Sequence, residues 1–140
     1  MINKHKIHKK PIPETMIWKV AFQILNALSV LHNMNILHRD IKPANIFFTK
    51  DYKSVILADL NVSIVTANGM AKTQTGTPYY ASPEVWMEKP YSSKCDIWSL
   101  GCVLYEMAAL RPPFMSSDLK SLKKSINSGV YKRITQPYST

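Results

Sequence analysis

The chain has 140 residues, of which 46% are hydrophobic and 19% are charged, a composition that allows one compact domain and excludes a disordered chain. No apolar run approaches the roughly 20 residues that a membrane helix needs, and the N-terminus lacks the apolar stretch of a secretory signal. We therefore expect no membrane partner and a cytoplasmic location, with the cytoskeleton or the nucleus as alternatives.

The net charge of +9, from 18 basic and 9 acidic side chains, raises the question of nucleic-acid binding. The basic residues occur in short clusters at 4–10, 120–124 and 132–133. Proteins that bind single-stranded nucleic acid place aromatic side chains among the basic ones, and these clusters have none. Solvated charged faces, together with a site that handles phosphate, are the favoured interpretation, and no nucleic-acid partner is expected.

The two cysteines, Cys95 and Cys102, are seven residues apart in a segment with a helical pattern. At the rise of an α-helix their Cα atoms would lie roughly 10 Å apart, which is too far for a disulfide. We expect both thiols to be reduced and to pack in the interior.

The first half of the chain predicts one long helix and two short strands. Residues 1–12 are interpreted as a basic lead-in, and a helix is predicted from about Pro13 to an end near Asn33 or Asn35. Its apolar residues recur at helical spacing: Ile17, Val20, Ala21, Ile24, Leu25, Leu28 and Leu31. Residues 36–45 are predicted to form a polar loop. Strands are predicted at 46–48 and 55–58, with a turn between them.

The second half predicts a long loop and two more helices. Residues 59–84 show no clear period, and a loop of that length in a compact domain is usually functional. A helix from about Asp96 to Leu110 is apolar on more than one side, so it should be a buried central helix. A polar helix follows at about 118–127, with Gly129 as its cap. The expected fold class is mainly α with a few short β-strands.

Residues 38–45 read His-Arg-Asp-Ile-Lys-Pro-Ala-Asn and match the catalytic loop of protein kinases, with Ile41 in place of leucine. Phosphoryl transfer needs an oriented hydroxyl, a magnesium clamp and neutralised phosphate charge. Asp40 would accept the hydroxyl proton, and Lys42 would offset negative charge on the moving phosphoryl group. Asn45 can offer a neutral oxygen to Mg²⁺, which prefers oxygen ligands.

Asp59 directly follows a predicted strand, and a strand end is a rigid place for a metal ligand. It opens the run Asp59-Leu60-Asn61, where protein kinases usually have Asp-Phe-Gly. Taken alone, Asp59 would be interpreted as the cap of a turn. The catalytic-loop pattern upstream favours a metal-binding role instead.

Two further patterns follow. Residues 73–84 resemble the end of a kinase activation segment, with Ser-Pro-Glu where Ala-Pro-Glu is usual, and residues 96–101 read Asp-Ile-Trp-Ser-Leu-Gly. Taken alone, the threonines within residues 73–84 would be interpreted as turn residues, and residues 96–101 as part of a core helix. In this order and spacing, the four patterns together resemble the protein kinase family.

Finer features resemble the NIMA-related kinases, namely the segments 13–18, 76–80 and 98–106. The resemblance covers nearly the whole chain and implies a partial protein kinase domain over residues 1–140. It implies the large, C-terminal lobe (the C-lobe), truncated at both ends, with the small lobe and the last helices missing. It also implies ATP and Mg²⁺ as cofactors and protein substrates that bear serine or threonine.

The resemblance implies roles for other residues as well. Thr77 would be catalytic, with its hydroxyl bonded near Asp40 and Lys42. Arg39 would bind a phosphate on Thr73 and so order the activation segment. Structural support is expected from three more residues, of which the last would hold the catalytic-loop backbone from the central helix: His38, Glu84 and Asp96.

Two functions remain open at this level. The set of Asp40, Lys42, Asn45 and Asp59 favours transfer of the ATP γ-phosphate to serine or threonine of protein substrates. The alternative is a kinase-derived binding or scaffold module without turnover, because the 140 residues contain no Gly-x-Gly-x-x-Gly loop and no Val-Ala-Ile-Lys segment. Asn61 in place of the usual glycine adds to that alternative, although asparagine tolerates left-handed geometry. A non-functional fragment of a duplicated gene is a third interpretation.

Overall fold

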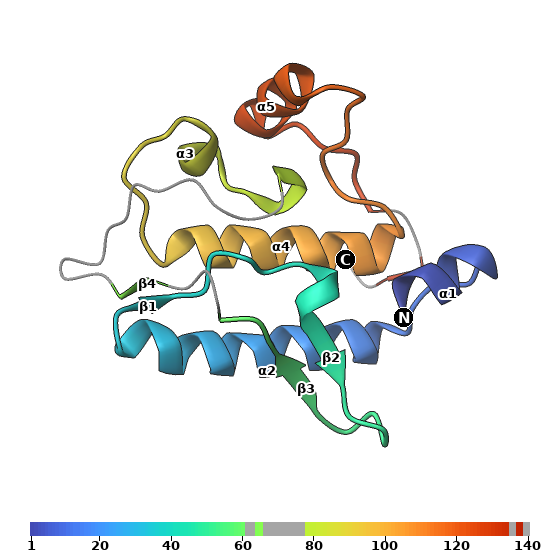
Figure 1. The fold of residues 1–140 in the computed structure, drawn as a ribbon. Coiled ribbons are helices and arrows are strands. Elements are labelled where there is room, and N and C mark those ends of the chain that lie inside the picture. Colours follow the sequence, from blue (N-terminus) through green and yellow to red (C-terminus); the bar gives the residue numbers. More distant parts are fainter. Residues whose placement is uncertain (61–63, 66–77, 135–136, 139–140) are drawn as a thin grey trace.

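The computed structural model describes residues 1–60, 64–65, 78–134 and 137–138. Two long helices, α2 (Glu14–Asn33) and α4 (Lys94–Ala109), lie side by side along the molecule (Figure 1). A hairpin of β2 (Ile46–Phe48) and β3 (Val55–Leu57) packs on α2. The short α3 (Pro83–Trp86) and the longer α5 (Leu119–Ser128) contact each other beyond α4. The predicted fold class, mainly α with a few short strands, is confirmed.

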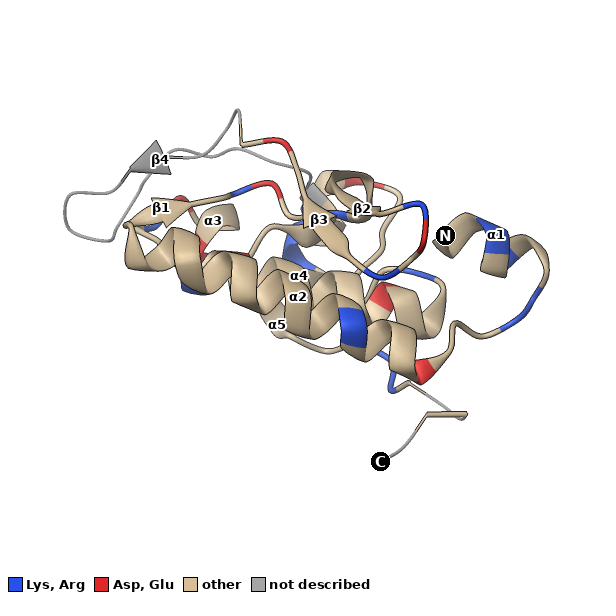
Figure 2. Cartoon of the chain, turned by 90° about the horizontal axis from the view of Figure 1, so that it is seen from below, with Lys and Arg blue, Asp and Glu red and all other residues tan. Residues whose placement is uncertain are grey.

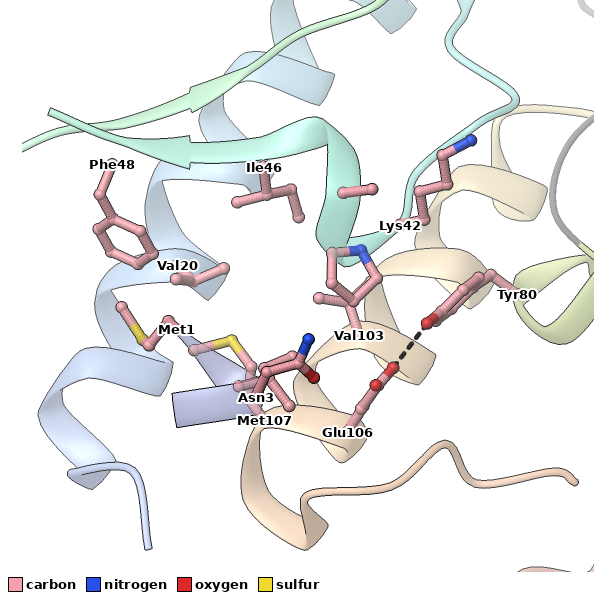
Figure 3. Close-up of a pocket in the computed structure, with 13 residues that line it drawn as sticks. Met1, Asn3, Val20, Lys42, Ile46, Phe48, Tyr80, Val103, Glu106 and Met107 are labelled. Carbon is pink, nitrogen blue, oxygen red and sulfur yellow. Dashed lines mark hydrogen bonds between the residues drawn. The ribbon is translucent and has the colours of Figure 1, made fainter. Parts of the chain in front are cut away.

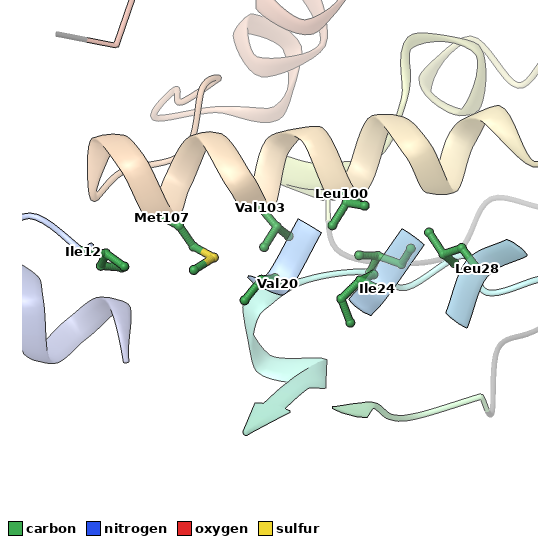
Figure 4. Close-up of a cluster of buried hydrophobic side chains, with 8 residues drawn as sticks. Ile12, Val20, Ile24, Leu28, Leu100, Val103 and Met107 are labelled. Carbon is green, nitrogen blue, oxygen red and sulfur yellow. The ribbon is translucent and has the colours of Figure 1, made fainter. Parts of the chain in front are cut away.

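The main hydrophobic core joins α2 to α4 (Figure 4). On α2, Val20, Ile24 and Leu28 recur every four residues and therefore share one face. Leu100, Val103 and Met107, spaced three and four residues apart, likewise share one face of α4, and Ile12 and Ile41 complete the cluster from the segments before and after α2. Because apolar side chains buried between two helices gain hydrophobic free energy, this seam sets how α2 and α4 pack. The predicted buried central helix is thus confirmed.

The N-terminal segment differs from the prediction. The sequence indicates only a basic lead-in over residues 1–12, but α1 (Ile2–Ile7) forms there, and Ile12 is only 1% exposed. Lysine and histidine dominate this segment, so its sequence pattern does not indicate that Ile12 is buried. Ile12 packs because α2 and α4 lie next to it. Leu25 departs from the prediction in the opposite sense, because it fits the apolar pattern of α2 but is 41% exposed.

Strand pairing also departs from the prediction in one place. The start of the predicted 36–45 loop forms β1 (Ile36–Leu37), which pairs antiparallel with β4 (Ile64–Val65). The two strands are far apart in sequence, so no local pattern indicates this pairing. The β2–β3 hairpin agrees with the prediction, with Ile46 opposite Leu57, except that β3 ends one residue earlier than expected.

The C-terminal helices agree with the prediction to within two residues. Asp118 caps α5 by accepting a hydrogen bond from the Ser121 amide at 2.8 Å, and Gly129 ends the helix with a φ of 66°. A second core lies under α5, where the rings of Trp98 and Phe114 stack with centroids 5.7 Å apart.

No helix in the described part of the chain is long and apolar enough to cross a membrane. Figure 2 shows Lys and Arg on α1, on α2 and at the hairpin turn.

The buried thiols lead to a prediction about alkaline pH. Cys95 and Cys102 are free and buried, and burial raises the pKa of each thiol from 9.0 to about 12. The unfolded chain therefore loses these protons first, so the stability that the thiols contribute is complete below pH 9 and is lost as the pH rises toward 12. Above pH 9 we expect the free energy of unfolding to fall by up to about 1.4 kcal/mol per pH unit for each thiol.

Urea unfolding between pH 8 and pH 10 measures this slope. The double variant Cys95→Ala, Cys102→Ala should have a flatter pH dependence than the parent chain, whatever its absolute stability. Equal slopes for the two proteins would show that the thiols do not ionise on unfolding in this range.

Candidate active site

Asp40, Lys42 and Asn45 form one hydrogen-bonded group. Lys42 Nζ donates to Asp40 Oδ2 at 2.6 Å, and Asn45 Nδ2 donates to the same oxygen at 3.0 Å and to the Asp40 carbonyl at 2.8 Å. A single 3₁₀ turn at Pro43–Asn45 folds Asn45 back over Asp40, and proline suits the first position of such a turn. Asp40 is 8% exposed, so these charge-assisted bonds hold its carboxylate in one orientation.

His38 links this loop to the end of the hairpin. The ring is fully buried; its Nε2 donates to the Ala58 carbonyl at 3.2 Å, and its Nδ1 accepts from the Asp40 amide at 3.3 Å. One ring nitrogen donates and the other accepts, so the bonding assigns a neutral imidazole with its proton on Nε2. Asp59 directly follows Ala58, so His38 ties the backbone at Asp40 to the residue before the candidate metal ligand.

Asp96 anchors the backbone of the loop from the first turn of α4. Its carboxylate is fully buried and accepts from the His38 amide at 3.0 Å and from the Arg39 amide at 2.8 Å. His32, on α2, donates from Nε2 to the same carboxylate at 2.8 Å. Arg39 has a φ of 71°, a left-handed conformation that is unfavourable for arginine. The Asp96 bonds therefore hold the loop in a shape that the free chain would avoid.

Sequence patterns did not indicate His32. Its partner lies 64 residues away, and a single histidine near a helix end gives no specific signal. The guanidinium of Arg39 lies over the Tyr91 ring, 5.8 Å from the ring centroid, a cation–π geometry that the sequence also did not predict.

Asn45 and Asp59 are placed at the same end of the β2–β3 hairpin. The Ala58 amide donates to the Asn45 carbonyl at 2.9 Å, so Asp59 follows the residue that is bonded to Asn45. Asp59 is exposed and has a φ of 70°. Because the Asn45 amide nitrogen is used on Asp40, its Oδ1 is the atom left for a ligand, and it accepts no hydrogen bond from the described residues.

These oxygens suit a magnesium ion shared with a substrate. Mg²⁺ is usually held by one or two protein oxygens together with phosphate oxygens and water. Among the described residues there is no group of three or more His, Cys, Asp and Glu side chains that could hold a metal without a substrate. The residues present therefore fit Mg²⁺ bound with a nucleotide better than a closed metal site.

Known proteins are similar in sequence to this chain over most of its length. The protein kinase domain family matches residues 1–139. The chain belongs to the protein kinase family. It is 40% identical over 143 residues to the Dictyostelium discoideum protein named "Probable serine/threonine-protein kinase nek2", an alignment that covers 99% of this chain and 34% of that protein.

Two mouse proteins support a narrower placement. The chain is 42% identical to serine/threonine-protein kinase Nek4 over 92% of its length and 46% identical to serine/threonine-protein kinase Nek1 over 84% of its length. It is a member of the NIMA-related serine/threonine kinases. The chain spans 16% of the first mouse protein and 10% of the second, so it corresponds to a small part of each.

A cavity of about 450 Å³ opens beside Lys42 in this kinase chain (Figure 3). At one wall Tyr80 donates from its hydroxyl to Glu106 Oε2 at 2.6 Å. Burial, and then the Glu106 carboxylate, raise the pKa of the Tyr80 hydroxyl well above its usual value. The remaining wall is largely apolar, with Val103 and Met107 from α4. The Tyr80–Glu106 bond holds the segment before α3 against the central helix.

The remaining predicted site residues are placed only in part. Thr73, Thr77 and Asn61 lie outside the described residues. Glu84 is half-buried in α3, and within the described part of the chain no hydrogen bond or ion pair reaches its carboxylate. Arg111, the nearest basic residue after α4, does not bond to Glu84 and instead donates to the Tyr105 hydroxyl at 3.5 Å.

Proposed function

We propose that this chain is the large, catalytic lobe of a NIMA-related kinase and transfers the γ-phosphate of ATP to serine or threonine of protein substrates. The observation that carries the proposal is the bonded group of Asp40, Lys42 and Asn45, whose loop backbone is held by the buried Asp96. The curated relatives named above are serine/threonine kinases, which supports the same reaction.

Asp40 is the residue that would orient the substrate hydroxyl and accept its proton. Its carboxylate is nearly buried and keeps its direction through bonds from Lys42 and Asn45, so little reorganisation is needed when a hydroxyl arrives. Lys42 brings a positive charge to within 2.6 Å of that carboxylate. In that position the charge can also stabilise a phosphoryl group that moves toward the hydroxyl.

Asn45 Oδ1 and the Asp59 carboxylate would hold Mg²⁺ with the nucleotide. Bound Mg²⁺·ATP supplies the phosphoryl group and neutralises part of its charge. Next to these residues, Phe47 and Ile56 stand directly opposite each other on the outer face of the hairpin, 52% and 50% exposed. A pair of exposed apolar side chains beside a metal site offers a surface for the nucleotide base.

Three further parts of the proposal are supported by the sequence pattern alone. Thr77 would bond near Asp40 and Lys42, and Arg39 would bind a phosphate on Thr73 by charge-assisted hydrogen bonds. A cytoplasmic location is the third.

An assay with labelled ATP tests the proposed function. The 140-residue chain is incubated with Mg²⁺ and a serine/threonine peptide, both alone and joined to the small lobe of a related kinase, with an alanine-substituted peptide as control. We expect label on the serine/threonine peptide and no label on the alanine-substituted peptide. When Mg²⁺ is chelated, we expect no label on either peptide. If neither form transfers phosphate while the joined form is folded and binds Mg²⁺·ATP, the chain acts as a binding module and the proposal fails.

A further inference from the structure

One face of α2 binds the exposed edge of the β2–β3 hairpin through polar side chains. Gln23 Oε1 accepts a hydrogen bond from the Val55 amide at 2.7 Å, and Gln23 Nε2 donates to the Lys53 carbonyl at 3.1 Å. One turn earlier on the same face, Lys19 Nζ donates to the Tyr52 carbonyl at 2.9 Å. Three successive backbone groups of the hairpin are therefore bonded to two side chains of one helix.

The hairpin register explains why these backbone groups are available. The Thr49 amide bonds the Ser54 carbonyl, and the Ala58 amide bonds the Asn45 carbonyl. Bonded and non-bonded pairs alternate along an antiparallel ladder, so Val55, opposite Phe48, is at a non-bonded position and its amide points away from β2. The Gln23 amide bonds this edge as the peptide group of another strand would.

Packing by itself would not fix the hairpin this well. Each strand has three residues, and an isolated two-stranded hairpin is marginally stable. The inner side chains of the hairpin pack on the main core, but apolar contact is non-directional and tolerates small shifts along the helix. Hydrogen bonds depend on distance and angle, so the two bonds of Gln23 define where β3 lies on α2.

The same hairpin carries the candidate metal ligands at its other end. Asn45 precedes β2, and Asp59 follows β3 after one intervening residue. A shift of β3 against α2 therefore changes the position of Asp59 relative to Asn45, which is separately tied to Asp40. We propose that Gln23 is a positioning residue for the metal site, because its side-chain amide fixes the hairpin on α2 and so sets the separation of the Asn45 and Asp59 oxygens.

The inference rests on the proposed function only where it assigns Mg²⁺ to Asn45 and Asp59. The test compares Gln23→Ala and Gln23→Glu with Asn26→Ala, a control on the next turn of α2. The Asn26 side chain is exposed and makes no hydrogen bond within the described residues. Gln23→Glu keeps an acceptor for the Val55 amide but loses the donor to the Lys53 carbonyl, so its effect should be intermediate.

Two quantities are measured in each variant. Hydrogen exchange of the Ala58 amide, which bonds to Asn45 at the site, should become about tenfold faster in Gln23→Ala, the change that follows when a hydrogen bond of ordinary strength is lost. In the form of the chain that transfers phosphate, the Mg²⁺ concentration for half-maximal rate should rise about 3-fold to 10-fold, with the rate at saturating Mg²⁺ within about twofold of the parent.

A merely structural role gives a different result. If Gln23→Ala lowers the melting temperature while Ala58 exchange and the Mg²⁺ midpoint match those of Asn26→Ala, Gln23 does not position the site and the inference is overturned. If the chain transfers no phosphate in any form, the proposed function fails, and Ala58 exchange still decides whether Gln23 positions the hairpin end. Unchanged Ala58 exchange overturns the inference in either case.

Discussion

Asp40→Asn is expected to lower the rate of phosphoryl transfer by about 10³-fold, within the range found when a catalytic acid or base is removed. Asparagine has nearly the same shape, so the loop should keep its backbone bonds to Asp96. What is lost is the negative charge that the Lys42 ammonium contacts at 2.6 Å and the basic oxygen that would take the hydroxyl proton. The effect should therefore fall on kcat, with the KM for ATP changed by less than about threefold.

Initial-rate kinetics with a serine/threonine peptide measure this change in the active form of the chain. Asp118→Asn is a matched control, because Asp118 caps α5 and asparagine is an equally good cap. Its rate should stay within about twofold of the parent. Retention of more than a tenth of the parent rate in Asp40→Asn, with unchanged folding, would show that Asp40 is not the group that handles the proton.

Asp96→Asn is expected to lower the free energy of unfolding by about 2 to 4 kcal/mol, because it leaves buried donors without acceptors. The Asp96 carboxylate accepts from His32, His38 and Arg39 through both oxygens and has no exposed surface. Asparagine has one acceptor oxygen, and its amino group would face a donor at the other position. Arg39 would then lose support for its left-handed backbone.

Urea unfolding at neutral pH measures this loss, and Asp51→Asn is the control for removing an exposed carboxylate at the hairpin turn. Hydrogen exchange of the His38 and Arg39 amides should also become faster in the Asp96 variant, since both amides lose their acceptor. A destabilisation below about 1 kcal/mol would mean that water or another side chain replaces the carboxylate.

Much of the fold could be read from local patterns. The apolar spacing of α2 and α4, and the polar segment that ends at Gly129, placed three helices to within two residues of their observed ends. These signals are reliable because a helix bonds to itself and its caps lie within a few residues. The sequence pattern also grouped Asp40, Lys42 and Asn45, which lie close together because one short turn contains them, and the structure shows Lys42 and Asn45 bonded to Asp40.

Other parts of the site depend on residues that are distant along the chain. His32 reaches Asp96 across 64 residues, and Gln23 reaches Val55 across 32, so no window of sequence contains either pair. The pairing of β1 with β4, the burial of Ile12 and the Tyr80–Glu106 bond have the same origin.

The sequence by itself determined the kinase family of this chain, its main helices and the polar side chains of the 38–45 loop. The tertiary structure decided which side chains hold that loop and the β2–β3 hairpin in place. The physical reason is range. Helix periodicity, caps and turns act over a few residues and leave a pattern in the sequence. The partners of a buried carboxylate such as Asp96, or of a strand edge such as that of β3, meet only after α2 and α4 have packed together.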